Sequence, residues 1–193
     1  ANMSHEIRTP ISGIIGIVDF LNKSELDAKQ KEYVNLIKSS AETLHNIVND
    51  VLLLSKFELG KIELINHEID LYAFVDELHD VFNSMPLRKV NIVKDVVDVP
   101  KYIKVDKNRL RQIMSNLISN ALKFTKQGEV IIKVRQQENI SKNKALLKVE
   151  IIDTGVGIKS VNIDKLFKDF SQIEASKSKN YEGAGLGLSI SKR

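Results

Sequence analysis

The chain has 193 residues, of which 42% are hydrophobic and 28% charged, a composition typical of a soluble globular protein with one large or two small domains. The net charge of +4 is mild and no basic run alternates with aromatic residues, so nothing supports nucleic-acid binding. Cysteine is absent, which excludes disulfides and thiolate metal sites. No apolar run approaches the about 20 residues that span a bilayer, so we expect a soluble fragment without membrane contact.

Residues 1–21 have the apolar spacing of an amphipathic helix. At about 100° per residue, one face collects the apolar side chains and the opposite face carries His5. The apolar stripe consists of Ile7, Ile11, Ile14, Val18 and Leu21. The periodicity therefore predicts an outward-facing histidine, with Thr9 and Gly16 beside it leaving room for another protein to approach.

Two neighbours favour a reactive histidine over a merely exposed one, which remains the alternative. Glu6 can accept a hydrogen bond from one ring nitrogen, which makes the other nitrogen of His5 a better nucleophile. Pro10 lacks the N–H that would bond the carbonyl of Glu6, and this favours a bend one turn after the histidine.

A second helix is predicted at 28–57, with Asp27 and Gln30 forming a capping box at its start. Its apolar stripe is too wide for two helices to bury. The stripe consists of Val34, Ile37, Ala41, Leu44, Val48 and Val51, widened by Leu36, Ile47, Leu52 and Leu54. We expect a homodimer with a four-helix bundle, and packing of the hairpin on a second domain is the alternative. Gly60 ends the helix, so domains are predicted at 1–59 and 60–193.

The second domain mixes strands and helices. Strands are predicted at 61–69, 90–97, 102–105, 129–137 and 145–153, with a polar loop at 139–144 between the last two. Helices are predicted at 71–84 and 106–124, capped by Asp70 and Asp106. This order favours an α+β sandwich with helices on one face of a sheet.

The helix at 106–124 carries a polar stripe on one face. Asn116, Asn120 and Lys123 share this face with Arg109 and Gln112. An amide oxygen is a hard ligand that suits Mg²⁺, and a lysine supplies a point charge for phosphate. A solvated polar face is the alternative.

Two glycine clusters follow. The first, Asp153-Thr154-Gly155-Val156-Gly157-Ile158, comes after a strand; a buried aspartate there could accept a hydrogen bond from the exocyclic amine of adenine, and a plain Asp-Gly turn is the alternative. The second, Gly183-Ala184-Gly185-Leu186-Gly187-Leu188, opens a helix whose N–H groups can cradle phosphate. The lysine-rich stretch at 173–182 is typical of a mobile lid.

Together these motifs resemble those of sensor histidine kinases. The run Ser4-His5-Glu6-Ile7-Arg8-Thr9-Pro10 resembles the H box. Residues 1–11 are most similar to hybrid kinases, which also carry a receiver domain. Residues 116–124 resemble the N box, 153–158 the G1 box and 183–188 the G2 box of the ATPase fold shared with gyrase-type ATPases, Hsp90-type chaperones and MutL-type repair proteins. The F box is resembled by Phe167 with Phe170-Ser171-Gln172.

The resemblance implies ATP and Mg²⁺ as cofactors and a role for each matching residue. His5 would accept the γ-phosphoryl group, Glu6 would polarise its ring, and Thr9 would position water for dephosphorylation of the partner. Asn120 would ligate Mg²⁺, and Asn116 and Lys123 would lie near the phosphates. Asp153 would recognise adenine. The remaining nucleotide-binding residues would be Gly155, Gly157, Ile158, Gly183, Gly185, Gly187 and Leu188.

The sequence also departs from the family pattern. Lys168-Asp169 replace the more usual Glu-Pro, Glu182 replaces a glycine, and Ala184 replaces a threonine. The family's domain continues beyond the position of Arg193 with further strands, so we expect the chain to be a C-terminally incomplete piece of a longer protein. It would act on the cytoplasmic side, and membrane attachment of the parent is left open.

We therefore expect an α+β protein in which a hairpin, dimerising into a four-helix bundle, precedes an α/β sandwich that binds ATP. It would phosphorylate itself on His5 and pass the group to an aspartate on the receiver domain of a response regulator, with phosphatase activity also open. A catalytically silent dimeric scaffold and an ATPase of this fold without phosphohistidine remain as alternatives. The sequence encodes neither the signal, nor the cognate receiver, nor whether phosphorylation occurs within or between protomers.

Overall fold

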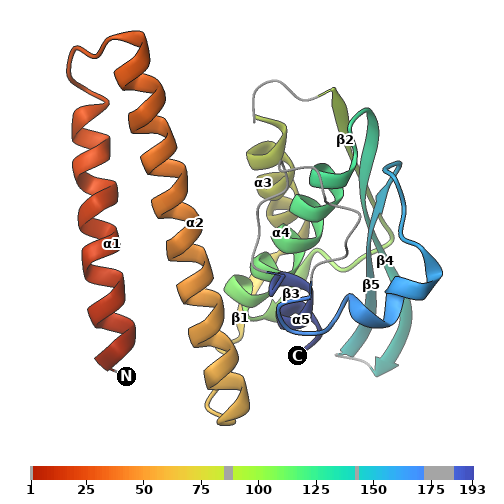
Figure 1. Ribbon diagram of the computed structural model, residues 1–193. Coiled ribbons are helices and arrows are strands. Elements are labelled where there is room, and N and C mark those ends of the chain that lie inside the picture. The colour runs from red at the N-terminus through yellow and green to blue at the C-terminus, as the bar shows by residue number, and fades with distance from the viewer. Residues whose placement is uncertain (1, 85–88, 142–143, 172–184) are drawn as a thin grey trace. The chain divides into compact units, whose positions relative to one another are not determined.

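The computed structural model describes residues 2–84, 89–141, 144–171 and 185–193 (Figure 1). The chain forms two compact units, residues 1–62 with 167–193, and residues 63–166. The domain boundary between residues 59 and 60 stays a prediction.

The first unit contains the predicted helical hairpin, α1 (Asn2–Leu21) and α2 (Ala28–Glu58) (Figure 1). The capping box is confirmed, because Asp27 Oδ1 accepts from the N–H of Gln30 at 2.8 Å and Gln30 Oε1 accepts from the N–H of Asp27 at 3.0 Å. Pro10 lies inside α1, which continues through it. Gly60 follows α2 at a φ of +62°, a left-handed conformation that favours glycine after a helix.

One side of each apolar stripe is buried within the hairpin. Ile11 and Val18 of α1 are buried, as are Val34 and Ala41 of α2. An ion pair between Lys38 Nζ and Asp19 Oδ1, at 2.6 Å, also joins the two helices, and this hydrogen bond raises the pKa of Lys38. The 3-4 spacing thus correctly predicts which side of each helix is apolar.

The second unit contains two sheets. In the larger sheet β2 (Val90–Val97) pairs in parallel with β4 (Gly128–Ser141), which pairs antiparallel with β5 (Lys144–Asp153). In the smaller sheet β1 (His67–Asp70) pairs antiparallel with β3 (Tyr102–Val105). The expected bounds of β2 and β3 are confirmed.

Two sequence-based expectations for the strands were wrong. The strand expected at 61–69 is shorter and begins at His67, because the N–H of Ile65 bonds Asp106 Oδ2 at 3.0 Å instead of a neighbouring strand. The loop expected at 139–144 is shorter, because Asn139 pairs with Ala145 and Ser141 with Lys144 in a continuation of the β4–β5 ladder. Polar residues can pair in a sheet through their backbone, which hydrophobic alternation does not reveal.

Two helices, α3 (Leu71–Asn83) and α4 (Lys107–Phe124), cover one face of the larger sheet (Figure 1). Alternate residues of β4, namely Val130, Ile132 and Val134, are fully buried there, as the two-residue period of a strand requires. The helices contribute the other half of the core. Their buried residues are Leu71, Phe74, Val75, Leu78 and Phe82 from α3 and Met114, Ile118, Ala121 and Leu122 from α4.

Two short helical segments complete the described chain, the 3-10 helix η1 (Ser160–Lys165) and α5 (Gly187–Lys192). In the first unit, α5 packs on the last turns of α2. Leu186, at the start of α5, and Ile190 are buried together with Leu53 and Leu54 of α2. The expected α+β class, with a helical hairpin preceding an α/β sandwich, is confirmed.

The N-cap Asp106 ties the start of α4 to the segment before β1. Its carboxylate accepts from the N–H groups of Asn108, Arg109 and Ile65 at 3.0 to 3.1 Å. These bonds, with that from Ile65 the largest cause, lower the pKa of Asp106 because they favour its charged form.

We predict that Asp106 contributes to the acid sensitivity of the second unit. Because its folded pKa is depressed, its contribution is fully present above the unfolded pKa of about 3.9 and is lost as pH falls through the folded value. Urea unfolding of Asp106→Asn, compared with wild type from pH 7 to pH 2, should show a shallower loss of stability with acid. Equal pH slopes for the two proteins would contradict the assignment.

Candidate functional site

The predicted polar face of α4 is present, and the residues that we expect at a nucleotide lie along it. Asn116, Asn120 and Lys123 are half-buried, whereas Met114 and Ile118 on the other side of α4 are in the core. Four- and three-residue spacing places successive members of this polar set on one side of the helix. Burial lowers the pKa of Lys123, so a nearby anion would restore the stability of its charged form.

Two other members of the polar stripe, Arg109 and Gln112, are hydrogen-bonded to each other. Arg109 Nη1 donates to Gln112 Oε1 at 3.0 Å, so both side chains are engaged one turn or more before Asn116. The first half of the polar face of α4 therefore carries this bonded pair, and the second half carries the two asparagines and the lysine.

The turn after β5 is packed against the last residue of α4. The N–H of Val156 bonds the carbonyl oxygen of Phe124 at 3.4 Å, and a Cβ on Gly155 would lie 2.6 Å from that oxygen. Position 155 therefore requires glycine for close approach rather than for a positive φ. This contact brings the turn at 153–156 beside the end of α4 that carries Lys123.

Thr154 fixes the same turn to the start of β4, a role that the sequence analysis missed. Its N–H bonds the carbonyl oxygen of Glu129 at 3.2 Å, and its Oγ1 accepts from the N–H of Glu129 at 3.0 Å. Gly128, with a φ of +125°, leaves room for this hydroxyl where a Cβ would collide with it. A hydroxyl between Asp153 and Gly155 is a weak signal in sequence, because its partner is 25 residues away.

Asp153 is exposed, so the expectation of a buried aspartate was wrong. It lies at the end of β5, where the sheet stops covering its side chain, and its Oδ1 accepts from the N–H of Gly155 at 2.8 Å. That bond fixes the direction of the carboxylate. In the same turn Gly157 has a φ of +69°, and Ile158 is exposed.

The described part of the second glycine cluster belongs to the first unit. Gly185 has a φ of +72°, Gly187 begins α5 and Leu188 is half-buried. Gly183 lies outside the described residues, as does the lid expected at 173–182. The second glycine cluster and the asparagines of α4 thus fall in different compact units.

The two phenylalanines of the predicted F box are exposed. Phe167 and Phe170 have 44% and 63% of their surface accessible, so neither side chain is packed in the core of the described residues. Lys192 Nζ lies 5.2 Å from the centroid of the Phe167 ring, within range of a cation–π interaction.

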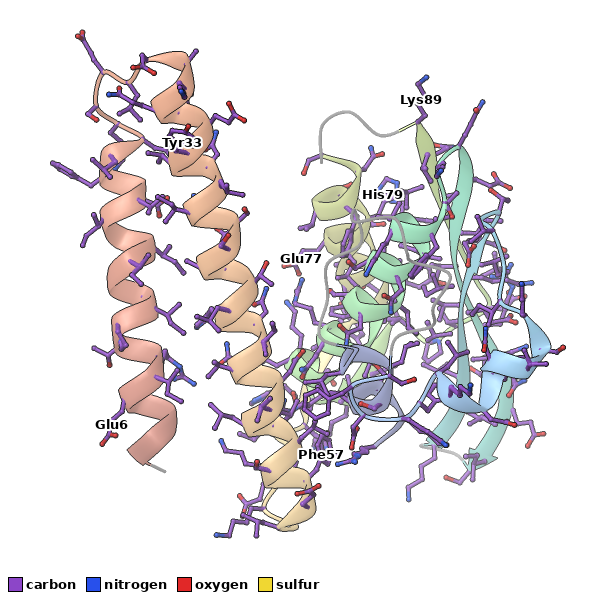
Figure 2. The ribbon with its side chains drawn as sticks, in the orientation of Figure 1. Glu6, Tyr33, Phe57, Glu77, His79 and Lys89 are labelled. Atoms are coloured by element: carbon purple, nitrogen blue, oxygen red, sulfur yellow. The ribbon has the colours of Figure 1, made fainter. Side chains whose placement is uncertain are left out.

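The helix face around His5 is polar and open. His5 is part of α1, but its side chain lies outside the described part of the structure. Glu6 and Thr9 are exposed, and Figure 2 shows Glu6 on the outer side of α1. Further along the helix, a Cβ added to Gly13 or Gly16 would meet no atom within 4 Å. The expected open surface is therefore present from Glu6 to Gly16.

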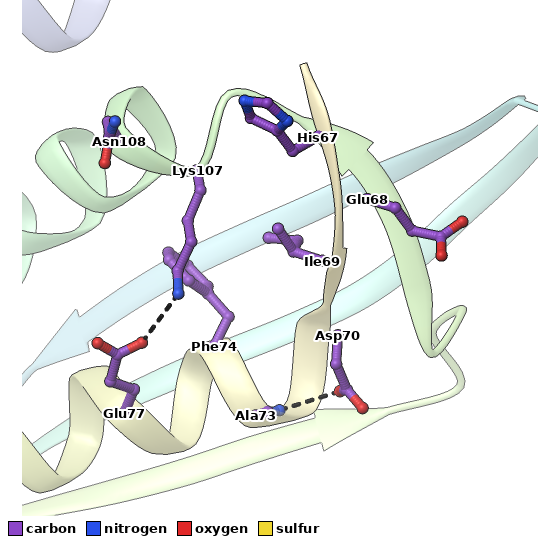
Figure 3. Close-up of a pocket in the computed structure, with 9 residues that line it drawn as sticks. All are labelled: His67, Glu68, Ile69, Asp70, Ala73, Phe74, Glu77, Lys107 and Asn108. Atoms are coloured by element: carbon purple, nitrogen blue, oxygen red, sulfur yellow. Dashed lines mark hydrogen bonds and ion pairs between the residues drawn. The ribbon is translucent and has the colours of Figure 1, made fainter. Parts of the chain in front are cut away.

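A pocket of about 470 Å³ lies elsewhere in the second unit, and it contains none of the predicted site residues (Figure 3). Its walls come from β1 and the first turns of α3 and α4. Glu77 in this pocket forms ion pairs with Arg111 at 2.7 Å and Lys107 at 3.3 Å, and hydrogen bonds from these two cations lower the pKa of Glu77. Glu77 and Lys107 in this pocket thus pair with each other, and the residues expected at a nucleotide lie elsewhere.

The described residues contain no group of three or more histidines or carboxylates that could hold a metal. A lone amide oxygen such as that of Asn120 fits Mg²⁺ only where phosphates and waters supply the other ligands, which is how this ion is usually bound.

None of the helices in the described ranges has the length and hydropathy of a membrane-spanning segment.

We predict that Gly155→Ala destabilises the second unit by about 1–3 kcal/mol, because the added methyl group would force the backbone of Phe124 to move. Gly157→Asn is the matched control, since asparagine tolerates a positive φ and no atom lies within 4 Å of the new Cβ. Thermal unfolding followed by circular dichroism should show a large loss only for Gly155→Ala. Equal losses would contradict the close-approach argument.

Comparison with known proteins gives two family matches along the chain. Residues 1–60 match the family model of the His Kinase A (phospho-acceptor) domain, and residues 105–193 match that of the histidine kinase-, DNA gyrase B-, and HSP90-like ATPase. The chain is 39% identical over 199 residues to hybrid signal transduction histidine kinase B of Dictyostelium discoideum, covering 99% of this chain and 10% of that protein. It is 40% identical over 195 residues to the sensor protein GacS of Pseudomonas syringae pv. syringae, covering 100% of this chain and 21% of that protein.

Among solved structures, the chain is similar to the crystal structure of full-length ShkA in complex with AMPPNP. The TM-score is 0.75 at 31% identity, covering 98% of this chain and 38% of that chain. This chain thus corresponds to a small part of each of these relatives. The two family matches occur in the order phospho-acceptor, then ATPase, and the alignments to histidine kinases cover 99–100% of this chain. The chain therefore combines the two domains of a sensor histidine kinase core, a phospho-acceptor domain followed by a histidine kinase-, DNA gyrase B-, and HSP90-like ATPase domain.

Proposed function

We propose that His5 is the phosphorylated residue and that ATP, with Mg²⁺, is held by the polar face of α4 and the turn at 153–156, with the second glycine cluster assigned to its phosphates from the family resemblance. The observation that carries this proposal is the contact between the Phe124 carbonyl and the turn at 153–156. It joins the end of the amide-bearing face of α4 to the carboxylate of Asp153 through one rigid backbone contact. A nucleotide has its charged and aromatic ends on one molecule and needs both groups side by side.

Each end of the proposed nucleotide has a matching group. Asp153, directed by its bond from Gly155, would accept a hydrogen bond from the exocyclic amine of adenine. Asn116 and Lys123 would contact phosphate oxygens, together with the N–H groups at Gly185, Gly187 and Leu188. Asn120 would hold Mg²⁺, which when bound neutralises charge on the phosphates. Gly183 is proposed for the same phosphate cluster from sequence alone.

In the proposed reaction, one ring nitrogen of His5 attacks the γ-phosphorus and ADP leaves. Glu6, exposed on α1, would accept a hydrogen bond from the other ring nitrogen and take up its proton as positive charge develops on the ring. The phosphoryl group then passes to an aspartate on the receiver domain of a response regulator, in the same or another chain. The open face near Gly13 and Gly16 suits such a docking. In the phosphatase reaction, Thr9 would position the water that hydrolyses the phosphoaspartate of the receiver.

We also propose that the chain dimerises through the half of its apolar stripes that the hairpin leaves uncovered. Seven-residue intervals relate the exposed side chains on each helix. They are Ile7, Ile14 and Leu21 on α1 and Ile37, Leu44 and Val51 on α2, each between 37% and 51% exposed. A seven-residue repeat is the pattern by which helices pair along a seam, so a second copy would complete a four-helix bundle.

The proposed domain boundary is at Gly60, where the helix ends, and the family match that ends at residue 60 supports it. The chain would work on the cytoplasmic side, where ATP is available, within a longer parent protein. The sensor proteins among its relatives support a role in detecting a signal, whose identity the chain does not encode.

We predict that His5→Gln abolishes acid-labile phosphate incorporation from Mg·ATP, because the amide lacks a nucleophilic ring nitrogen. Asn120→Ala should reduce incorporation by about 100-fold or more by weakening charge stabilisation at the phosphates. Labelling with γ-³²P-ATP followed by acid treatment measures both. Label that persists in His5→Gln would refute the proposed site, and phosphate release without any protein label would favour the ATPase alternative. A wild-type chain that takes up neither nucleotide nor label would favour the silent scaffold.

We predict that Ile14→Asp weakens dimerisation by about 100-fold or more, because each dimer would bury two unpaired carboxylates. Phe20→Asp is the matched control, since Phe20 is 74% exposed but lies on the His5 side of α1. Sedimentation velocity should show a monomer for Ile14→Asp and a dimer for both wild type and Phe20→Asp. A monomeric wild-type protein would contradict the bundle.

A further inference from the structure

Helix α5 lies against residues 167–171, and the far end of this contact is held by charge. Arg193 Nη2 donates to Asp169 Oδ2 at 2.7 Å, and both side chains are about one-third exposed. One residue earlier, Lys192 lies over the ring of Phe167. The end of α5 is thus linked to residues 24 positions earlier in the chain.

The near end of the same contact is held by close packing. A Cβ on Gly185 would lie 2.8 Å from the carbonyl oxygen of Ser171 and 3.1 Å from the carbonyl carbon of Phe170. Phe170 itself has a φ of +57°, a conformation that is rare for a bulky side chain and persists only where its surroundings impose it. Residues 185–193 therefore contact residues 167–171 at both ends.

A third contact holds α5 from another side without fixing its rotation. Leu186 and Ile190 are buried with Leu53 and Leu54 of α2, but apolar contacts are non-directional and tolerate small rotations of a short helix. An ion pair between a guanidinium and a carboxylate is directional. The direction in which the N–H groups at the start of α5 point is therefore set mainly by the charged contact at its end and the Gly185 contact at its beginning.

We propose that Asp169 and Arg193 are positioning residues for phosphate binding, because they fix the orientation of the backbone at 185–188. Neither side chain needs to touch the nucleotide. This inference rests on the proposed role of Gly185, Gly187 and Leu188 at the phosphates and adds to it two side chains that act through the backbone.

The test is a double-mutant cycle with Asp169→Asn, Arg193→Gln and the double variant. Each single substitution should raise the Kd of Mg·AMPPNP and the KM for ATP in autophosphorylation by about two- to fivefold, the range expected for a partly exposed ion pair. The value of kcat should change little, since His5 and the reacting groups are untouched. The double variant should bind no more weakly than the weaker single variant, because the second substitution removes nothing further.

Asp76→Asn is the matched control, since it removes an ion pair of similar length, Lys94–Asp76 at 2.6 Å, on α3 and β2. It should leave the Kd and KM unchanged. Single variants that bind like wild type, or a double variant whose loss equals the product of the two single losses, would overturn the positioning role while leaving the proposed function intact. A wild-type chain that binds no Mg·AMPPNP would instead overturn the proposed function and this inference with it.

Discussion

The contact between the carbonyl of Phe124 and the glycine turn after β5 is the constraint on which the candidate site depends. A helix end and a strand end can approach this closely only where one of them carries no side chain, and Gly155 meets that need. Thr154 then fixes the turn to β4 on its other side through two bonds to Glu129. Asp153 and the polar end of α4 are thereby held next to each other by backbone contacts and by the Thr154 hydroxyl. The nucleotide proposed for this site would meet groups that are already in place.

In the hairpin, the informative feature is the set of apolar side chains that the two helices leave exposed. Ile11 and Val18 are buried by α2, whereas Ile7 and Ile14 on the adjoining side of the same stripe remain substantially exposed. Water contact at regularly spaced branched side chains is costly, and its regular spacing indicates a helical partner rather than a small ligand. The exposed polar face of α1 lies on the other side. One helix thus separates a surface suited to permanent association from one suited to transient docking.

Much of this was predictable from sequence because it depends on local rules. Asp27 and Asp106 act as caps through bonds to neighbouring residues, and the strands β2 and β3 follow the alternation of their side chains. The polar face of α4 follows from helical geometry. What failed depends on partners distant in the chain. The bond from Ile65 to Asp106 shortens β1, and the exposure of Asp153 reflects where the sheet ends. Periodicity identifies which face of an element is apolar, but not which element will cover it. Packing of the hairpin on the second domain was therefore left as an alternative, and α5 was not identified as the element that covers the end of α2.

The apolar contact between α5 and the last turns of α2 limits how α5 can move. A fully buried leucine or isoleucine is worth roughly 1.5–3 kcal/mol, whereas a partly exposed ion pair contributes about 1 kcal/mol or less. Separating α5 from α2 would expose Leu186, Ile190, Leu53 and Leu54 together. A small rotation of this short helix therefore costs less free energy than its separation from α2. Loss of the Arg193–Asp169 ion pair is therefore expected to change the orientation of α5 rather than to detach it from α2.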